Sequence, residues 1–228
     1  MTDTKPRAED INVICGGQGG DGSLTVINIL ADVLRGGGMK VYTERDVRSR
    51  IKGGITSATL RAFLGDRLCI GSKLDLLVAF DTLAVKLYAY RLDSTSVVIY
   101  DNSAGDLGDD VDIPEGARLI GVPLSRCAVK SFRRDIYKNS IAFAVVGRFL
   151  GLDDEEMRQS FNKRFARRGA QLLKYNLEAL EIGFGLAEDA GLSVGSGRYA
   201  FETAEAKPQM LITGNEATAF GFAAAGGR

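Results

Sequence analysis

Residues Gly16–Gly22 read GGQGGDG and lie between two apolar segments. The preceding segment, 11–15, is mainly apolar like a buried strand, and the following one, 23–35, has helical spacing. A glycine-rich loop between a strand and a helix N-terminus brings backbone N–H groups together, and these can hold a phosphate. The same glycines can instead serve only a tight turn and close helix packing. Both interpretations remain open at this point.

Strand-like and helical periodicities alternate along the first half of the chain. Strands are expected at 11–15, 39–43, 55–63, 75–80, 96–100 and 118–122, and helices at 23–35 and 83–92. Several of these strands lack a polar face, so helices must cover both sides of the sheet. We therefore predict an α/β fold with a mostly parallel, Rossmann-like sheet flanked by helices and followed by a helical C-terminal portion.

Composition divides the chain into three parts. Residues 1–187 hold the predicted sheet and helices, and 188–207, which are poor in aliphatic residues, are expected to form a linker. Residues 208–228 begin another strand-to-helix unit that is apolar on nearly every face. We therefore expect them to be the start of a second domain, and this chain to be an N-terminal fragment of a longer protein.

Charge and hydropathy exclude two kinds of partner. The 29 Lys and Arg residues balance 29 Asp and Glu residues, so no overall field attracts nucleic acid or an anionic membrane. The sequence has neither a long apolar segment nor the apolar region of a secretory signal. Cytoplasmic residence is the expectation.

The missing residue types restrict the chemistry. The chain contains no histidine, which excludes a Ser-His-Asp triad, a Cys-His pair and a His-ligated metal. Its three cysteines, Cys15, Cys69 and Cys127, are too widely spaced for a typical cluster motif, and we expect reduced, mostly buried thiols. No catalytic residue and no metal ligand are therefore predicted.

A second loop, 45–54, reads RDVRSRIKGG and combines cations with a glycine pair. Guanidinium, ammonium and backbone N–H groups together suit a phosphate, although a solvated basic loop is the simpler explanation. Because the loop follows the second strand, it should lie at the same carboxyl edge of the sheet as the glycine loop. Its cations are Arg45, Arg48, Arg50 and Lys52.

Three acidic residues follow predicted strands. Glu44 lies at the distance expected for a ribose-binding acid, and Gly17, Gly19 and Gly22 have GxGxxG spacing, so an NAD(P)-binding Rossmann domain is one alternative. Asp81 and Asp101 each end an apolar run, and we expect them to cap the next helix or turn.

Four stretches resemble a known family. GGQGGDG, SRIKGGITSATLRAF at 49–63 and DLLVAFD at 75–81 resemble the gamma domain of the 2-oxoacid:ferredoxin oxidoreductases, which include the pyruvate and 2-oxoglutarate enzymes. LITGNEATAFGFAAAGGR at 211–228 resembles the opening of the alpha, pyrimidine-binding domain of the same family. Gamma followed by alpha is the order found in the fused alpha subunit of two-subunit members.

The resemblance implies oxidative decarboxylation of a 2-oxoacid to an acyl-CoA, with electrons passed to ferredoxin. It implies that this domain binds the nucleotide end of CoA, while thiamine pyrophosphate, Mg and an iron-sulfur cluster lie elsewhere, so that the isolated fragment is inactive. The implied partners are the beta subunit, the remaining alpha-subunit domain and, indirectly, ferredoxin, in an oligomer. A purely structural interaction module is the other alternative. The implied CoA-binding residues are Gly16, Gly17, Gln18, Gly19, Gly20, Asp21, Gly22, Ser23, Ser49, Arg50, Lys52, Gly53 and Gly54.

Overall fold

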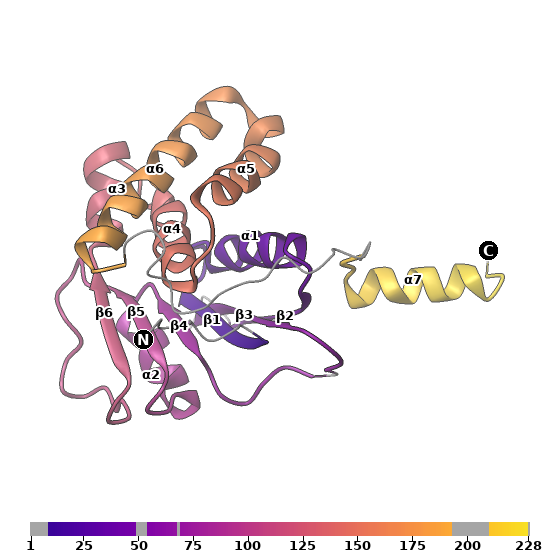
Figure 1. The fold of residues 1–228 in the computed structure, drawn as a ribbon, viewed down its shortest axis with the longest axis horizontal. Coiled ribbons are helices and arrows are strands. Elements are labelled where there is room, and N and C mark those ends of the chain that lie inside the picture. Colours follow the sequence, from indigo (N-terminus) through magenta and orange to yellow (C-terminus); the bar gives the residue numbers. More distant parts are fainter. Residues whose placement is uncertain (1–8, 49–53, 68, 193–209, 228) are drawn as a thin grey trace, which may run out of the picture.

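A computed structural model describes residues 9–48, 54–67, 69–192 and 210–227, and these form a sheet covered by helices (Figure 1). The six strands are β1 (Asp10–Gln18), β2 (Lys40–Val47), β3 (Ile55–Phe63), β4 (Leu76–Ala79), β5 (Val97–Asp101) and β6 (Arg118–Val122). Their order in the sheet is β2-β3-β1-β4-β5-β6. Strands β1, β4, β5 and β6 pair in parallel, whereas β3 runs antiparallel to both β1 and β2. The predicted α/β class is confirmed, with a mixed sheet in which only β3 is reversed.

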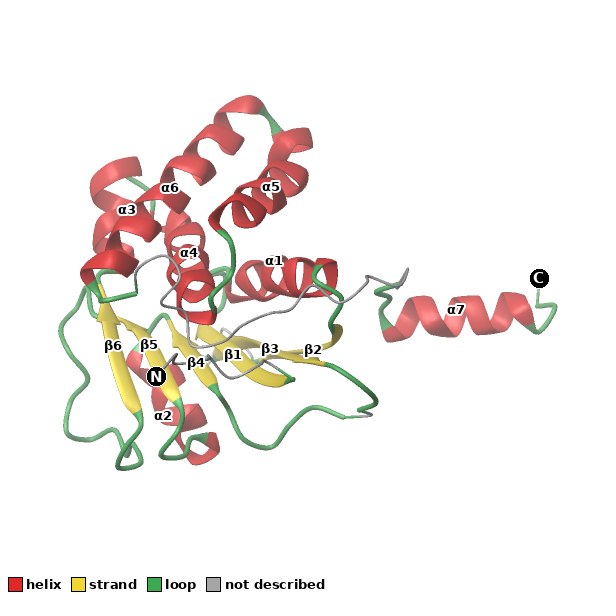
Figure 2. Cartoon of the chain, in the orientation of Figure 1, coloured by secondary structure: helices red, strands yellow, loops and turns green. Residues whose placement is uncertain are grey.

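The helices cover the two faces of the sheet unequally (Figure 2). Helices α1, α3, α4, α5 and α6 lie on one side of the sheet, and α2 lies on the other (Figures 1 and 2). The α-helices are α1 (Ser23–Gly36), α2 (Thr82–Tyr88), α3 (Leu124–Phe132), α4 (Lys138–Leu150), α5 (Asp154–Phe165), α6 (Ala170–Asp189) and α7 (Gly214–Ala224). Short 3-10 helices are η2 (Ala89–Arg91), η3 (Asp135–Tyr137) and η4 (Ala166–Arg168).

The core has one layer on each side of the sheet because successive residues of a strand point to opposite faces. On the helix-rich side, Val13 of β1 and Phe143 of α4 belong to the same hydrophobic cluster. All residues of α4 are buried. On the other side, Ile14 and Leu77 pack with Val85 of α2. The central strands are thus buried on both faces, which explains their unbroken apolar sequences.

Strand β2 differs most from its prediction. It continues to Val47, whereas the sequence pattern ended it at residue 43, and nearly all of its residues are exposed. Pairing with β3, for example Arg45 with Ala58, maintains the strand where no apolar pattern marks it. Arg45 therefore belongs to the strand and not to the predicted basic loop.

Other local expectations also need correction. The predicted helix 83–92 is divided between α2 and η2, and Cys69 is exposed, while Cys15 is buried and Cys127 half-buried. All three cysteines are free thiols, as predicted, and burial raises the pKa of Cys15. Most of the predicted linker lies outside the described residues, and its first residues, Glu188 and Asp189, belong to α6.

The C-terminal segment forms a helix, α7, that stands away from the sheet (Figure 1). A capping box begins it, because Thr213 Oγ1 accepts from Glu216 N at 3.2 Å and Glu216 Oε2 accepts from Thr213 N at 2.6 Å. The strand expected before this helix is absent from the described residues 210–213. Among the described helices, none has both the length and the apolar character needed to cross a membrane.

Candidate functional site

The glycine loop joins β1 to α1 in the way that the sequence predicts. Gly20 and Gly22 have left-handed backbone angles, with φ of 101° and 84°, which glycine adopts without strain. The N-cap of α1 is Gly22, no side chain caps this helix, and its first turn contains no acidic residue. Backbone N–H groups at this end are therefore available to an external anion.

Close packing explains why several positions of this loop require glycine. A Cβ on Gly17 would lie 2.8 Å from the Cβ of Phe80, and one on Gly22 would overlap the amide of Asn139. Gly16, Gly17 and Ser23 are buried, whereas Gln18 and Gly20 at the tip are exposed. Contact with a ligand is thus restricted to the tip of the loop and the start of α1, and the deeper glycines are required by the core.

A buried lysine fixes the loop to α4. Lys138 is only 5% exposed, and its Nζ lies 3.3 Å from Asp21 Oδ1, 2.6 Å from Asp135 Oδ2 and 5.3 Å from the centroid of Phe80. Burial lowers the pKa of Lys138, but the two carboxylates outweigh it and the pKa ends above its usual value. Burial raises the pKa of Asp21 and outweighs the opposite effect of Lys138.

Sequence reasoning missed Lys138 and Asn139. Both precede or begin an apolar helix far along the chain, and no local pattern connects them with the glycine loop. Asn139 is buried, and its Oδ1 has no hydrogen-bond partner among the described residues.

The two strand-terminal aspartates are caps, as predicted. Asp81 Oδ1 accepts from Ala84 N at 2.8 Å at the start of α2. Asp101 Oδ2 accepts from Ser125 N at 3.0 Å at the start of α3, and its Oδ1 accepts from Ser103 N at 3.0 Å. These carboxylates stabilise two helix starts at the carboxyl edge of the sheet.

The basic segment 45–54 connects the antiparallel strands β2 and β3, and we call this connection the basic hairpin. Its described ends lie at the same edge of the sheet as the glycine loop. Gln18 at the end of β1 pairs with Ile55, and Val47 at the end of β2 pairs with Thr56. Arg48 N donates to the oxygen of Ile55 at 3.3 Å, and Gly54 directly precedes β3. The predicted site residues Ser49, Arg50, Lys52 and Gly53 lie outside the described residues.

The geometry argues against the ribose-binding role of Glu44. Glu44 pairs with Thr59 inside β2, which continues for three more residues to Val47. Strand β3 also separates β2 from β1, so Glu44 does not lie beside the glycine loop as the acidic residue of a dinucleotide fold does.

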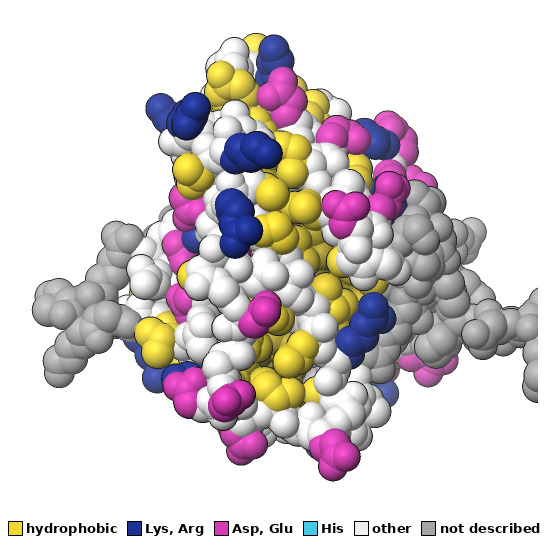
Figure 3. All heavy atoms as spheres, turned by 90° about the vertical axis from the view of Figure 1, so that its left-hand side faces the viewer, with side chains coloured by type: hydrophobic (Ala, Val, Ile, Leu, Met, Phe, Trp, Pro, Cys, Tyr) yellow, Lys and Arg dark blue, Asp and Glu magenta, His cyan; other side chains and the backbone are white. Residues whose placement is uncertain are grey.

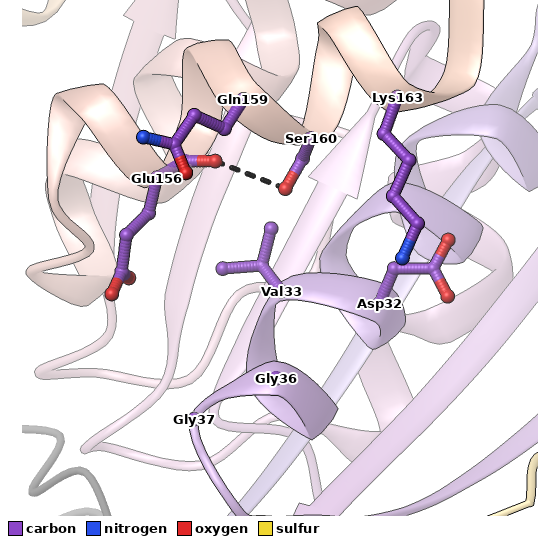
Figure 4. A pocket seen from close by; sticks show the side chains of 8 residues that line it. All are labelled: Asp32, Val33, Gly36, Gly37, Glu156, Gln159, Ser160 and Lys163. Carbon is purple, nitrogen blue, oxygen red and sulfur yellow. Dashed lines mark hydrogen bonds between the residues drawn. The ribbon is translucent and has the colours of Figure 1, made fainter.

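A hollow lies at the C-terminal end of α1, away from the glycine loop. It has a volume of about 290 Å³ and lies between the C-terminal end of α1 and helix α5 (Figure 4). Lys163 extends from α5 towards Asp32, which is also 4.0 Å from Arg164 and 3.8 Å from Arg35 (Figure 4). This hollow is an interhelical groove at the amino edge of the sheet.

No group of three or more Asp, Glu or Cys residues in the described parts of the chain could hold a metal ion.

Comparison with known proteins identifies the family. The family described as pyruvate ferredoxin/flavodoxin oxidoreductase matches residues 12–186. The 2-oxoglutarate synthase subunit KorC of Archaeoglobus fulgidus is 24% identical over 181 residues, which cover 77% of this chain and 87% of that protein.

Solved structures also match this chain. A 2-oxoglutarate:ferredoxin oxidoreductase from Magnetococcus marinus, with 2-oxoglutarate, coenzyme A and succinyl-CoA bound, is 26% identical with a TM-score of 0.82. That match covers 94% of this chain, which spans 37% of the length of the Magnetococcus chain. The gamma subunit of a keto/oxoacid ferredoxin oxidoreductase from Geobacter sulfurreducens has a TM-score of 0.66 at 20% identity, covering 80% of this chain and 99% of that subunit. Pyruvate oxidoreductase subunit PORC from Thermotoga maritima has a TM-score of 0.63 at 17% identity, covering 78% of this chain and 97% of its own.

These matches confirm the resemblance on which the sequence interpretation rests. The family match extends from β1 through most of α6 and includes the glycine loop, both capping aspartates and Lys138. The chain therefore belongs to the pyruvate ferredoxin/flavodoxin oxidoreductase family, of which it carries a gamma-type domain.

Proposed function

We propose that this chain provides the gamma domain of a 2-oxoacid:ferredoxin oxidoreductase and binds the phosphates of CoA at the carboxyl edge of its sheet. The enzyme would convert a 2-oxoacid to an acyl-CoA and pass the electrons to ferredoxin. The observation that carries the proposal is the uncapped start of α1, which follows an exposed glycine tip. Val47 and Ile55, which flank the sequence segment that contains Arg50 and Lys52, lie at the same edge of the sheet.

The charges near the loop are compatible with an anionic ligand. Asp21 is the acidic residue of the loop, and Lys138 pairs with it at 3.3 Å. Neutral N–H donors of the loop would then meet the phosphates, and the cations of the hairpin would add charge-assisted hydrogen bonds. Holding the nucleotide end of CoA would position its thiol for a reaction elsewhere, so this chain would contribute binding and not bond making.

The remaining cofactors fit other parts of the enzyme. The described residues contain no acidic or cysteine cluster for a metal ion, and the three cysteines are free. We therefore assign thiamine pyrophosphate, Mg and the iron-sulfur cluster to polypeptide outside this domain.

We also propose that α7 begins the alpha domain of a fused subunit. Its Phe220 and Phe222 are 57% and 60% exposed, as expected for a helix whose neighbours lie in another domain or subunit. The match to the long Magnetococcus chain covers 94% of this sequence, against 80% and 78% for the two shorter proteins, which supports the same conclusion. The beta subunit and the rest of the alpha domain are the partners that this arrangement implies.

Titration of CoA into the complete enzyme tests the assignment of the hairpin. We expect Arg50→Ala with Lys52→Ala to weaken CoA affinity about tenfold or more, since each charge-assisted hydrogen bond contributes about 1.5–3 kcal/mol. Lys73→Ala is the matched control, because Lys73 pairs with Asp93 at 3.0 Å on the opposite edge of the sheet. Unchanged CoA affinity with lost decarboxylation would contradict the proposal.

The same titration separates the alternatives. An NAD(P)-binding domain would bind NAD or NADP and lose affinity on Glu44→Ala, while CoA would not compete. A purely structural module would bind neither nucleotide, and in the assembled enzyme the glycine tip would be protected from ligand by another chain. The packing roles of Gly17 and Gly22 are the observation that favours this second alternative.

A further inference from the structure

A hollow of about 580 Å³ lies between the end of α3, η3 and the start of α6. Its volume is in the range of small-molecule sites. Three aromatic side chains, Phe132, Tyr137 and Tyr175, and two cations, Arg134 and Arg168, line it together with the first residues of α6. The lining contains no acidic residue.

The start of α6 gives one side of this hollow the character of an anion site. Gly169 is the N-cap of this 20-residue helix, with φ of 113° and no side-chain cap. The first helical hydrogen bond runs from Leu173 N to the oxygen of Gly169, so the preceding N–H groups of the helix are free of intrahelical partners. The helix dipole adds partial positive charge there, and Arg134 and Arg168 add two full charges.

The other side of the hollow is aromatic. The ring centroids of Phe132 and Tyr137 are 4.7 Å apart, and Tyr175 is 5.7 Å from each of them. Tyr137 is only 5% exposed, and its side chain lines the hollow. A tyrosine offers both an aromatic ring and a hydroxyl, which suits a ligand that has a flat apolar part and a polar group.

The hollow lies on the same side of the molecule as the glycine loop. Tyr137 directly precedes Lys138, which pairs with Asp21 of that loop. Ser140 near the start of α4 donates to Asn176 of α6 at 2.7 Å, so the two helices begin side by side. Figure 3 shows the face at the left of Figure 1, on which hydrophobic side chains are exposed beside several Lys and Arg side chains.

We propose that this hollow binds a nucleoside phosphate, with the base against the aromatic rings and the phosphate at the start of α6 between Arg134 and Arg168. A ligand with one flat apolar part and one anionic part satisfies both sides of the hollow. A free nucleotide and the nucleotide end of CoA share this chemistry. The proposal rests on the residues of the hollow and not on CoA binding at the glycine loop.

Equilibrium dialysis of the complete enzyme with labelled AMP and 3′,5′-ADP tests the proposal. We expect saturable binding below about 1 mM, weakened about tenfold by Arg134→Ala with Arg168→Ala. Tyr137→Phe keeps the ring and removes only the hydroxyl, and should weaken binding about threefold. Lys130→Ala is the matched control, since Lys130 is an exposed cation of α3 that does not line the hollow. Displacement of the label by CoA, lost in the same arginine variant, would identify the CoA end as the source, whereas binding unaffected by CoA would identify a free nucleotide.

Two results would overturn the proposal. The first is the absence of saturable nucleotide binding to the correctly folded wild-type enzyme. The second is unchanged nucleotide affinity in both the double arginine variant and Tyr137→Phe. If the arginine variant instead loses a partner subunit during purification while nucleotide never binds, the hollow is a subunit contact and the nucleotide assignment is wrong. Loss of CoA binding on Lys52→Ala alone would bear on the glycine loop and leave this site unaffected.

Discussion

Two kinds of helix start meet at the carboxyl edge of the sheet. Helices α2 and α3 begin beside strand-terminal aspartates, Asp81 and Asp101, whose carboxylates bond to the first free N–H groups. Helices α1 and α6 begin at Gly22 and Gly169 and have no side-chain cap. In the first pair a carboxylate of the fold accepts a hydrogen bond from one free N–H group of each helix, whereas the second pair leaves these donors to a ligand, water or another chain. The same edge of the sheet thus holds helix starts with a carboxylate acceptor and helix starts without one.

The largest expected effect concerns the glycine at the uncapped start of α1. Gly22→Ala should lower the free energy of unfolding by about 2–4 kcal/mol, because an alanine at φ 84° is strained and its Cβ overlaps Asn139. Urea denaturation followed by circular dichroism measures this change. Gly36→Ala is the control, since nothing lies within 4 Å of its Cβ, and it should change stability by less than about 1 kcal/mol. Equal effects of the two substitutions would show that Asn139 and the left-handed turn do not constrain the loop.

Removal of the aspartate caps should have an intermediate effect. Asp81→Ala and Asp101→Ala should each lower the free energy of unfolding by about 1–2 kcal/mol, because the first N–H groups of α2 and α3 lose their acceptors. Asp81→Asn keeps an acceptor oxygen and should recover most of the loss. Denaturation at constant pH measures all three variants. If Asp81→Ala instead leaves stability unchanged and removes CoA binding, the carboxylate serves a ligand and the comparison fails.

The smallest expected effect is a difference in pH dependence between two aspartates. The hydrogen bond from Arg61 at 2.5 Å lowers the pKa of Asp10 below 3.8, so its stabilisation is present above that pH and is lost as the pH falls through the folded value. Burial raises the pKa of Asp21 above 3.8, so stability is lost as the pH rises through its folded value.

Two asparagine variants measure this difference. Asp10→Asn should lower stability by about 1 kcal/mol at pH 7 and by less near pH 3, whereas Asp21→Asn should be least harmful at pH 7. Urea midpoints measured between pH 3 and 7 give, for each variant, the slope of its stability change against pH. If the two variants give slopes of the same sign, then ionisation of Asp21 does not destabilise the folded protein and the interpretation of its raised pKa is wrong.

Local sequence patterns predicted most of the elements that contribute side chains to the core. Strands β1, β3, β4 and β5 and helix α1 lie close to their expected positions because unbroken apolar or alternating residues report the two buried faces of the sheet. Strand β2 was predicted too short, since Glu44 and Arg45 are held by pairing with β3 and not by burial. An edge strand of this kind has no distinctive hydrophobic period.

The candidate site divides in the same way. The sequence alone determined that a glycine loop follows β1, that Asp81 and Asp101 can cap helices, and that a basic segment follows β2, because each depends on residues adjacent in the chain. Only the tertiary structure decided that Lys138 and Asn139 close the loop from α4, that β3 separates Glu44 from β1, and that Tyr137 and Tyr175 share a hollow with the start of α6. Such contacts join segments far apart in the chain, and packing, not local backbone preference, selects which of them meet.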